Sequence, residues 1–282
     1  MAMSQNTSSN IDPLTVQGFG DEWNTFDQTD LPPEEARAIF DAYFSCFRWD
    51  LVDKNSVGFD MGCGSGRWAK IMAPRIGHLH CVDPSTALNV ARLNLEGQDN
   101  VSFHQASVDA VPLQPGSMDF GYSLGVLHHI PDTAAAIKSC ADLLKPGAPL
   151  QLYLYYRFDT RPAWFRALWT LAEGTRLLVC RLPYNARVTV TGVIAAVAYW
   201  PLSRIAKLVA AMGLNPASLP LSFYRDSSFY TMRTDALDRF GTRLEQRFTR
   251  KEITAMFHAA GCGDVKFSDH EPFWCACAIR NG

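Results

Sequence analysis

Three glycines stand at alternate positions in one short stretch of this 282-residue chain. The apolar run Val57–Asp60 before them predicts a buried strand, and the pattern Arg67–Met72 after them predicts a helix. Gly62, Gly64 and Gly66 lie between the two, where glycine permits positive φ and a close approach of the backbone to a ligand. This order predicts the first unit of a parallel α/β sheet, with a ligand at the turn.

Short apolar runs continue to alternate with helical patterns along the chain. Strands are expected at Leu79–Val82, Val101–His104, Met118–Leu124 and Leu150–Tyr156, with helices from Ser85 to Leu95 and from Asp132 to Leu144. Near the end, Thr249 is expected to cap a helix that leads into a hairpin of strands near Val265–Ser268 and Phe273–Ile279. We therefore expect a doubly wound, mostly parallel seven-stranded α/β sheet with an antiparallel last strand.

Residues 158–245 interrupt this alternation. Apolar helical segments are expected at Pro162–Cys180 and Val188–Met212, followed by a polar, aromatic-rich segment, Ser222–Arg247. We expect a helical insertion after the fifth strand that lies over the carboxyl edge of the sheet, where such folds bind ligands. The predicted organisation is an N-terminal helical cap (1–50), a cofactor-binding core (51–157 and 246–282) and a lid for the acceptor (158–245).

The composition limits the partners of the chain. Apolar residues make up 48% and charged residues 19%, and the net charge of −2 offers no basic excess for nucleic acid. Met1–Asn10 lacks the basic and apolar regions of a signal peptide, so the eight Cys are expected to be reduced thiols of a cytoplasmic protein. Cys262, Cys275 and Cys277 suit a buried strand better than a metal site, and we expect no metal.

The longest uncharged apolar stretch is Val188–Ser203, which is shorter than the ~20 residues of a membrane span and contains Pro201. We therefore expect no transmembrane segment. Few Lys or Arg flank Val193–Tyr199, so a hydrophobic acceptor pocket or a homodimer interface is favoured over contact with a membrane surface.

The glycine turn is compatible with two cofactors. Gly64-Ser-Gly66-Arg-Trp-Ala69 has the G-x-G-x-x-A form of a dinucleotide fingerprint, and Asp83 follows at the distance of a ribose-binding acid. A carboxylate at Asp60, however, would oppose a pyrophosphate at the helix N-terminus. It could instead hold the ammonium group of S-adenosylmethionine, directly or through water, so that cofactor is favoured over NAD(P).

The ordered motifs resemble those of class I S-adenosylmethionine-dependent methyltransferases, over about two thirds of the chain, and the enzymes that act on ubiquinone and menaquinone most of all. Segments 60–66 and 81–85 resemble the first two motifs, 101–120 the adenine loop and fourth strand, and 127–132, 143–147, 248–252 and 260–261 the later landmarks. The resemblance implies the fold, the cofactor and methyl transfer, whereas the acceptor varies within the family.

Carried over residue by residue, the resemblance implies a cofactor site. Its members are Trp23, Asp60, Gly62, Cys63, Gly64, Ser65, Gly66, Asp83, Pro84, Ser107, Val108, Leu124 and Gly125. Many relatives have an acidic residue where this chain has Ser107, so Ser107, the Val108 backbone or Asp109 would contact the adenine. Trp23 or Phe19 could fold over the adenosine, or simply pack on the sheet.

Two histidines are the candidates for catalysis. His128 and His129 follow the fourth strand at the carboxyl edge, where each could act as a general base, contact the cofactor or bond to the turn. Methyl transfer is an in-line displacement that depends mainly on positioning, so a base helps only if the acceptor keeps its proton at neutral pH.

Acceptor contacts are expected from the insertion and from the end of the fifth strand. The candidates are Tyr156, Arg157, Tyr224, Tyr230, Arg233 and Asp235, with Asp238 as an alternative to Asp235. Tyr156 is preferred to Tyr153 and Tyr155 because it lies at the carboxyl end and on the other face. The predicted activity is methyl transfer to a small natural-product, quinone-like or sugar-like acceptor. The alternatives are an NAD(P)-dependent oxidoreductase and a non-catalytic protein that binds an adenosyl cofactor.

Overall fold

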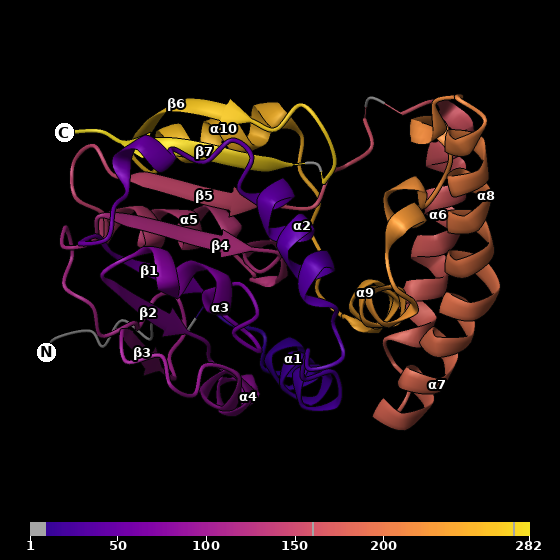
Figure 1. The fold of residues 1–282 in the computed structure, drawn as a ribbon, viewed down its shortest axis with the longest axis horizontal. Helices are drawn as coiled ribbons and strands as arrows, with labels where there is room; N and C mark the ends of the chain where they lie inside the picture. Colours follow the sequence, from indigo (N-terminus) through magenta and orange to yellow (C-terminus); the bar gives the residue numbers. More distant parts are fainter. Residues whose placement is uncertain (1–9, 160, 273) are drawn as a thin grey trace, which may run out of the picture.

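The structure is a computed structural model that describes residues 10–159, 161–272 and 274–282. Its strands are β1 (Val57–Met61), β2 (His78–Val82), β3 (Val101–His104), β4 (Phe120–Leu124), β5 (Pro149–Tyr153), β6 (Cys262–Phe267) and β7 (Cys275–Arg280). They form a seven-stranded sheet in the order β3-β2-β1-β4-β5-β7-β6 (Figure 1), in which β7 runs antiparallel to both neighbours. The predicted fold class is confirmed. The predicted polar segment 1–9 and Phe273 lie outside the described residues.

Helices cover both faces of the sheet. They are α1 (Pro13–Thr25), α2 (Pro33–Tyr43), η1 (Trp49–Leu51), α3 (Ala69–Met72), η2 (Ala73–Arg75), α4 (Ala87–Asn94), η3 (Leu127–His129), α5 (Thr133–Asp142) and α10 (Arg250–Ala259). On one face, Ile137 of α5 and Phe257 of α10 pack into a core with Leu150. On the other, Phe40 and Phe44 of α2 join a second core. The capping box of Thr249 and Glu252 starts α10 where the sequence predicted.

Some element boundaries differ from the prediction. β5 ends at Tyr153, and Tyr156 forms only an isolated bridge to Phe248. β4 begins at Phe120, because Met118 pairs outside the ladder with Leu144. The residue before α4 is Thr86 and not Ser85, although the Ser85 hydroxyl accepts a bond from the Ala87 N–H at 3.2 Å.

The segment after β5 forms a helical layer beyond the carboxyl ends of the strands (Figure 1). It contains α6 (Ala163–Val179), α7 (Tyr184–Ile194), η4 (Ala195–Tyr199), α8 (Trp200–Ala211), η5 (Pro216–Ser218), η6 (Ser222–Asp226) and α9 (Phe229–Gly241). Val179, Tyr199, Met232 and Phe240 are buried together between these helices. The helical insertion predicted after the fifth strand is therefore present.

Pro201 does not interrupt the apolar stretch, contrary to the prediction. The π-helical turn η4 directly precedes α8, and Pro201 is the second residue of α8. A π turn shifts the backbone hydrogen bonds by one residue, which accommodates a proline that has no N–H to donate. Tyr184–Ala211 is thus one helix of 28 residues, long and apolar enough by composition to cross a membrane, with 22% of its most apolar window buried. Helices of soluble proteins can also pass this test.

Close packing between β1 and β4 depends on glycine. A methyl group on Gly121 would lie 2.1 Å from the Phe59 ring, whereas one on Gly174 of α6 would meet no atom within 4 Å. We predict that Gly121→Ala lowers the free energy of unfolding by about 1–3 kcal/mol through overpacking. Gly174→Ala should raise it by about 0.5–1 kcal/mol, because alanine favours the helix. Urea denaturation of both variants measures the difference, and an unchanged midpoint for Gly121→Ala would contradict this packing.

Candidate active site

A cavity of about 530 Å³ lies at the carboxyl edge of the sheet. The glycine turn, the ends of β4 and β5, helix α1 and the helical layer after β5 all contribute to its wall. Of the predicted cofactor site, the wall contains Trp23, Gly62, Cys63, Gly64, Ser65, Asp83, Pro84, Ser107, Val108, Leu124 and Gly125. The predicted location of the site at the carboxyl edge agrees with this geometry.

The turn after β1 needs glycine for two reasons. Gly62, Gly64 and Gly66 have φ values of +81°, +53° and +76°. A methyl group on Gly64 would lie 2.9 Å from the indole nitrogen of Trp23, so the α1 side chain covers the turn. Gly66 is not part of the cavity wall, because it faces the side chains of Ala91 and Leu95.

Asp83 fixes the shape of this turn. Its carboxylate accepts a hydrogen bond from the Gly64 N–H at 2.9 Å and, on the other oxygen, from the Ser85 N–H at 2.8 Å and hydroxyl at 2.6 Å. The side chain is buried in the cavity wall. A fixed carboxylate in this position can accept hydrogen bonds from the paired hydroxyls of a ribose.

Asp60 lies beneath the turn rather than in the cavity wall. The side chain is buried, and its Oδ2 has no hydrogen-bond partner among the described residues. Burial raises the pKa of Asp60 to about 8, and the nearby Asp83 adds to the effect. A ligand in the cavity would therefore reach Asp60 through an intervening group such as water rather than directly.

The loop after β3 lies close to helix α1 and the residues before it. Ser107 and Val108 line the cavity, but Asp109 accepts a hydrogen bond from the Asn10 N–H at 2.9 Å and is not in the wall. Of the three groups predicted to contact the adenine, Asp109 is therefore the one that lies away from the cavity.

The two histidines after β4 occupy different environments. His129 lines the cavity, whereas His128 is fully buried, with neither ring nitrogen hydrogen-bonded in the described part of the chain. Burial lowers the pKa of His128 well below its usual value, and the neighbouring His129 and Arg247 add to this. The His128 ring lies against Tyr155, with 3.8 Å between centroids. Of the pair, only His129 is placed to meet a ligand.

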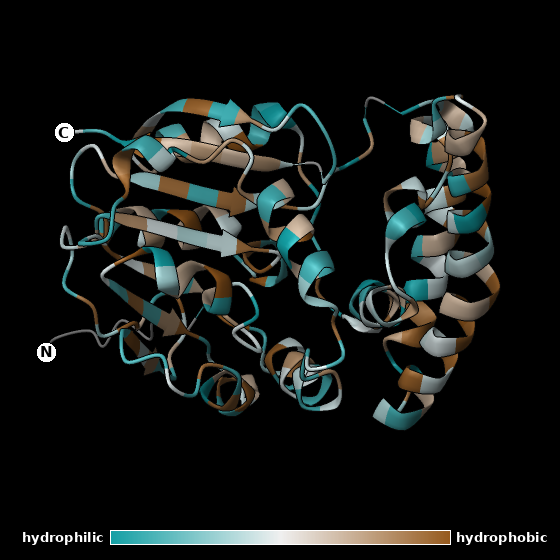
Figure 2. Ribbon diagram, viewed as in Figure 1, coloured by the Kyte–Doolittle hydropathy of each residue, from teal (hydrophilic) through white to brown (hydrophobic). Residues whose placement is uncertain are grey.

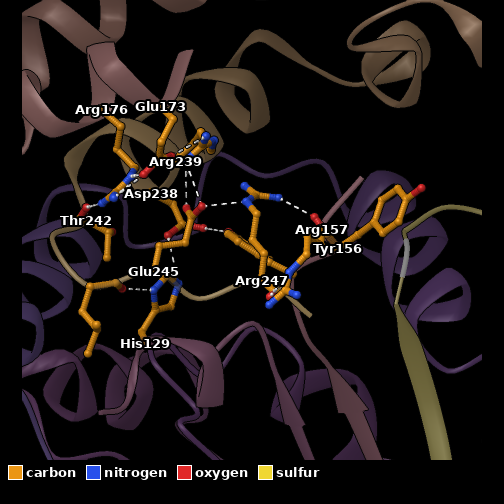
Figure 3. Close-up of polar contacts among 12 residues, drawn as sticks. His129, Tyr156, Arg157, Glu173, Arg176, Asp238, Arg239, Thr242, Glu245 and Arg247 are labelled. Carbon is orange, nitrogen blue, oxygen red and sulfur yellow. Dashed lines mark hydrogen bonds and ion pairs between the residues drawn. The ribbon is translucent and has the colours of Figure 1, made fainter. Parts of the chain in front are cut away.

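The hydrogen bonds of His129 determine which nitrogen carries its proton. Nδ1 lies 2.6 Å from the Leu244 carbonyl oxygen, which can only accept, so Nδ1 must donate. The neutral ring therefore presents an unprotonated Nε2, which lies 3.7 Å from Oδ1 of Asp238 (Figure 3). The other oxygen of Asp238 accepts a hydrogen bond from the Tyr155 hydroxyl. Two buried acceptors, Nε2 and Oδ1, thus lie close together, and no described residue donates a hydrogen bond to either.

Three carboxyl groups come together near His129. Asp235 and Asp238 project from α9, and Glu22 from α1, and all three line the cavity. Burial raises the pKa of Glu22 well above its usual value, and Asp238 adds to the rise. Burial also raises the pKa of Asp235 to about 6, against the effects of Arg67 and the Tyr224 hydroxyl. Sequence analysis missed Glu22, because one acid in an isolated amphipathic helix gives no sign of what it faces.

A buried ionic network holds these elements together (Figure 3). The side chain of Glu245 is 2% exposed, and its carboxylate accepts hydrogen bonds from Arg239 at 2.9 and 3.0 Å and from Arg247 at 2.8 Å. Glu173 of α6 bonds to Arg239 at 3.1 Å and to Arg176. The Arg247 guanidinium in turn lies 5.0 Å from the centre of the Tyr155 ring. Sequence analysis missed Glu245, Arg247 and Tyr155 as site residues.

The predicted acceptor residues divide into two groups. Tyr156, Tyr224 and Asp235 line the cavity, whereas the others lie outside its wall. These are Arg157, which is half-exposed and pairs with Glu252 at 2.9 Å; Tyr230, which accepts from the Gln28 N–H at 3.0 Å; and Arg233, which lies over Phe26 at 5.2 Å. Each of these three residues therefore contacts neighbouring side chains or backbone rather than the cavity.

The end of the cavity beneath the helical layer is apolar. Aromatic and aliphatic side chains there come mainly from the loop after β5 and from α6, α8 and η6, and they include Phe158, Phe165, Leu168, Trp169, Leu202 and Phe223. An apolar acceptor would gain free energy by leaving water for this region.

The sequence of the core matches known proteins. Residues 59–151 match the family model described as a methyltransferase domain. With the strand order and the glycine turn, this match supports the resemblance to class I S-adenosylmethionine-dependent methyltransferases that the motifs predicted. The predicted cofactor is confirmed, and the match does not support the NAD(P) alternative.

Named relatives are similar over the same part of the chain. The ubiquinone biosynthesis O-methyltransferase of Aromatoleum aromaticum is 33% identical over 150 residues, which cover 49% of this chain and 60% of that protein. The protein of the same name from Xanthomonas campestris pv. campestris is 32% identical over 151 residues, covering 52% and 63%. The matched part therefore spans about three fifths of the length of these relatives.

A solved structure shares the fold over most of the chain. A chain of the complex between the Haloferax volcanii Trm112 methyltransferase activator and a candidate methyltransferase aligns with a TM-score of 0.51. It covers 93% of this chain and 97% of that chain at 14% identity, which supports the fold alone.

The ionic network should be necessary for stability. Glu245→Gln keeps the size of the side chain but leaves the buried Arg239 and Arg247 without their shared counter-charge. We predict that it lowers the free energy of unfolding by about 3–5 kcal/mol. Asp226→Asn is the control, since its partner Lys207 and Asp226 itself are exposed, and its effect should stay within about 0.5 kcal/mol. Equal effects of the two substitutions in chemical denaturation would refute the structural role of Glu245.

Proposed function

We propose that this chain transfers a methyl group from S-adenosylmethionine to a hydroxyl oxygen of a small, mainly apolar acceptor. The observation that carries the proposal is the pair formed by His129 Nε2 and Asp238 Oδ1, 3.7 Å apart in the cavity wall. Both atoms are acceptors when the ring is neutral, so a ligand that donates a proton between them would satisfy two buried groups at once.

The cofactor half of the cavity fits S-adenosylmethionine, which supplies an electrophilic methyl group on its sulfonium. Gly62 and Gly64 let the backbone approach it closely, and Asp83 accepts hydrogen bonds from the ribose hydroxyls. Ser107 and Val108 line the adenine, and Trp23 covers the adenosine from α1. Leu124, Gly125, Cys63, Ser65 and Pro84 complete the wall, and Asp60 acts on the ammonium group through water.

His129 takes the proton of the acceptor hydroxyl. Its Nδ1–H is held by the Leu244 carbonyl, so Nε2 is the nitrogen left to accept a proton, beside Asp238. Asp238 then stabilises the charged imidazolium, while Tyr155 keeps that carboxylate in place. His128 supports the arrangement by packing on Tyr155 and takes no part in proton transfer.

The acceptor occupies the apolar end of the cavity. Phe158, Phe165, Leu168 and Trp169 favour an aromatic or aliphatic body over a sugar-like one. Tyr156, Tyr224 and Asp235 also line the cavity and offer polar contacts to the acceptor. The names of the relatives, which are O-methyltransferases of ubiquinone biosynthesis, support oxygen as the methylated atom and a quinol-like acceptor. In this proposal residues 158–245 form the acceptor lid, residues 1–50 the cap, and the rest the cofactor core.

Cofactor binding tests the first half of the proposal. In calorimetric titration we expect saturable binding of S-adenosylhomocysteine and none of NADH. Asp83→Ala should weaken that binding about a hundredfold, because hydrogen bonds to a charged group are lost. Asp41→Ala, which removes an exposed partner of Arg37 that is not part of the cavity wall, should leave the affinity unchanged. Binding of NADH instead would exclude the proposed cofactor site.

Turnover tests the second half. With an acceptor found by screening hydroxylated aromatic compounds against labelled S-adenosylmethionine, His129→Gln and Asp238→Asn should each lower kcat by about 10²–10⁴-fold. Their affinity for S-adenosylhomocysteine should stay within twofold of the original protein, roughly the error of a titration. His258→Gln, on the exposed side of α10, serves as the matched control. Full kcat in both variants would leave positioning alone as the source of catalysis. Binding of S-adenosylhomocysteine with no turnover of any acceptor would favour a non-catalytic protein.

A further inference from the structure

The outer side of the helical layer is apolar where water would meet it. Large side chains of α6, α7–α8 and the turn after them are 52–74% exposed: Trp164, Leu171, Leu178, Val197, Leu208 and Met212. We call these six residues the apolar face. Figure 2 shows apolar segments repeated along α6, α7 and α8, at the side of the molecule that faces away from the sheet. Soluble monomers rarely expose so many large apolar side chains together.

The helix Tyr184–Ala211 is apolar on both its inner and its outer side. On the inner side, Ala195 and Tyr199 are buried in a cluster with α9, and Thr191, Ser203 and Ala206 are buried as well. On the outer side, Val197 and Leu208 are exposed. Apolar side chains on the outer side indicate a surrounding less polar than water.

The charge of the helical layer indicates which kind of partner covers the apolar face. Residues 161–225 contain eight Arg and Lys but one acidic residue, a formal charge of +7 in a chain of −2. Three of these cations pair with acids outside the segment, Arg161 with Glu271 and both Lys207 and Arg225 with Asp226. The single acid, Glu173, is already paired with Arg176 and Arg239. Arg166 of α6 and Arg181, in the turn directly after α6, are exposed. Apolar side chains set among cations favour an anionic lipid bilayer over a second copy of the same positive surface.

The contacts of the inner side argue against insertion across the bilayer. Arg204 donates to the Arg225 and Ser227 carbonyls at 3.1 and 2.9 Å, and Arg187 donates to the Gly241 carbonyl at 2.9 Å. Spanning the membrane would remove these guanidinium groups from their partners and bury them in hydrocarbon. If the helix instead lies in the plane of the membrane interface, each of these hydrogen bonds is kept.

We propose that the apolar face docks on the surface of an anionic lipid bilayer, with α6 and the helix Tyr184–Ala211 in the plane of the interface. The sequence had favoured a pocket or a homodimer because few cations flank Val193–Tyr199. In the fold, these cations come from Arg166 of α6 and Arg181 directly after it. Leu168 and Leu202 of the same helices also line the cavity, so an acceptor dissolved in the membrane would be delivered beside it, a point that rests on the proposed function.

Flotation of the full chain with vesicles tests the docking. We expect it to bind mixed phosphatidylcholine–phosphatidylglycerol vesicles, and more weakly as salt is raised. The double substitution Arg166→Gln with Arg181→Gln should weaken binding about twentyfold. Leu171→Gln should weaken it about tenfold, since one exposed leucine no longer enters the interface. Leu93→Gln is the matched control, because Leu93 of α4 is 73% exposed and Leu171 is 72% exposed, and it should have no effect.

Titration with S-adenosylhomocysteine shows that each variant is folded, and its outcome is independent of docking. Absence of flotation with anionic vesicles at low salt would overturn the proposal. So would a dimer in solution, measured by light scattering, that Leu171→Gln dissociates while no vesicle binding occurs. Loss of methyl transfer with vesicle binding intact would refute the proposed function and leave the docking standing.

Discussion

The buried carboxylate of Glu245 is the interaction on which the geometry of the cavity depends. It neutralises Arg239 of α9 and Arg247 of the segment before α10, and so joins the helical layer to the core. Arg247 packs on Tyr155, whose hydroxyl bonds to Asp238 beside Arg239. The separation of Asp238 from His129 therefore follows from an ion cluster rather than from the sheet. Such a cluster tolerates little change, because an uncompensated buried charge is costly.

The two halves of the cavity are built in different ways. The cofactor half depends on backbone geometry close in sequence: a strand, a glycine turn and the acid after the next strand. The half proposed to hold the acceptor is assembled from side chains far apart in the chain, including Glu22 from α1 and Asp238 from α9. Local backbone geometry therefore determines one half of the cavity, and tertiary packing determines the other.

This division explains what the sequence could predict. The glycine turn, the position of Asp83 after the second strand and the Thr249 cap all depend on neighbouring residues, and each was predicted. Tyr155 was ranked below Tyr156, which lies nearer the carboxyl end, although Tyr153 and Tyr155 do share a side, with 5.7 Å between ring centroids. Pro201 was taken as a helix breaker, because a π turn before it leaves no pattern in the sequence. Glu245 and Arg247 belong to no motif, so only tertiary structure brings them together.

Helix α1 touches both halves of the cavity. Trp23 covers the glycine turn, and Phe19, one turn earlier, packs on His129 with 5.0 Å between ring centroids. One short helix therefore covers the glycine turn and packs on the histidine at the same time. Any displacement of α1 would uncover both together, so access of water to the turn is linked to access of water to His129.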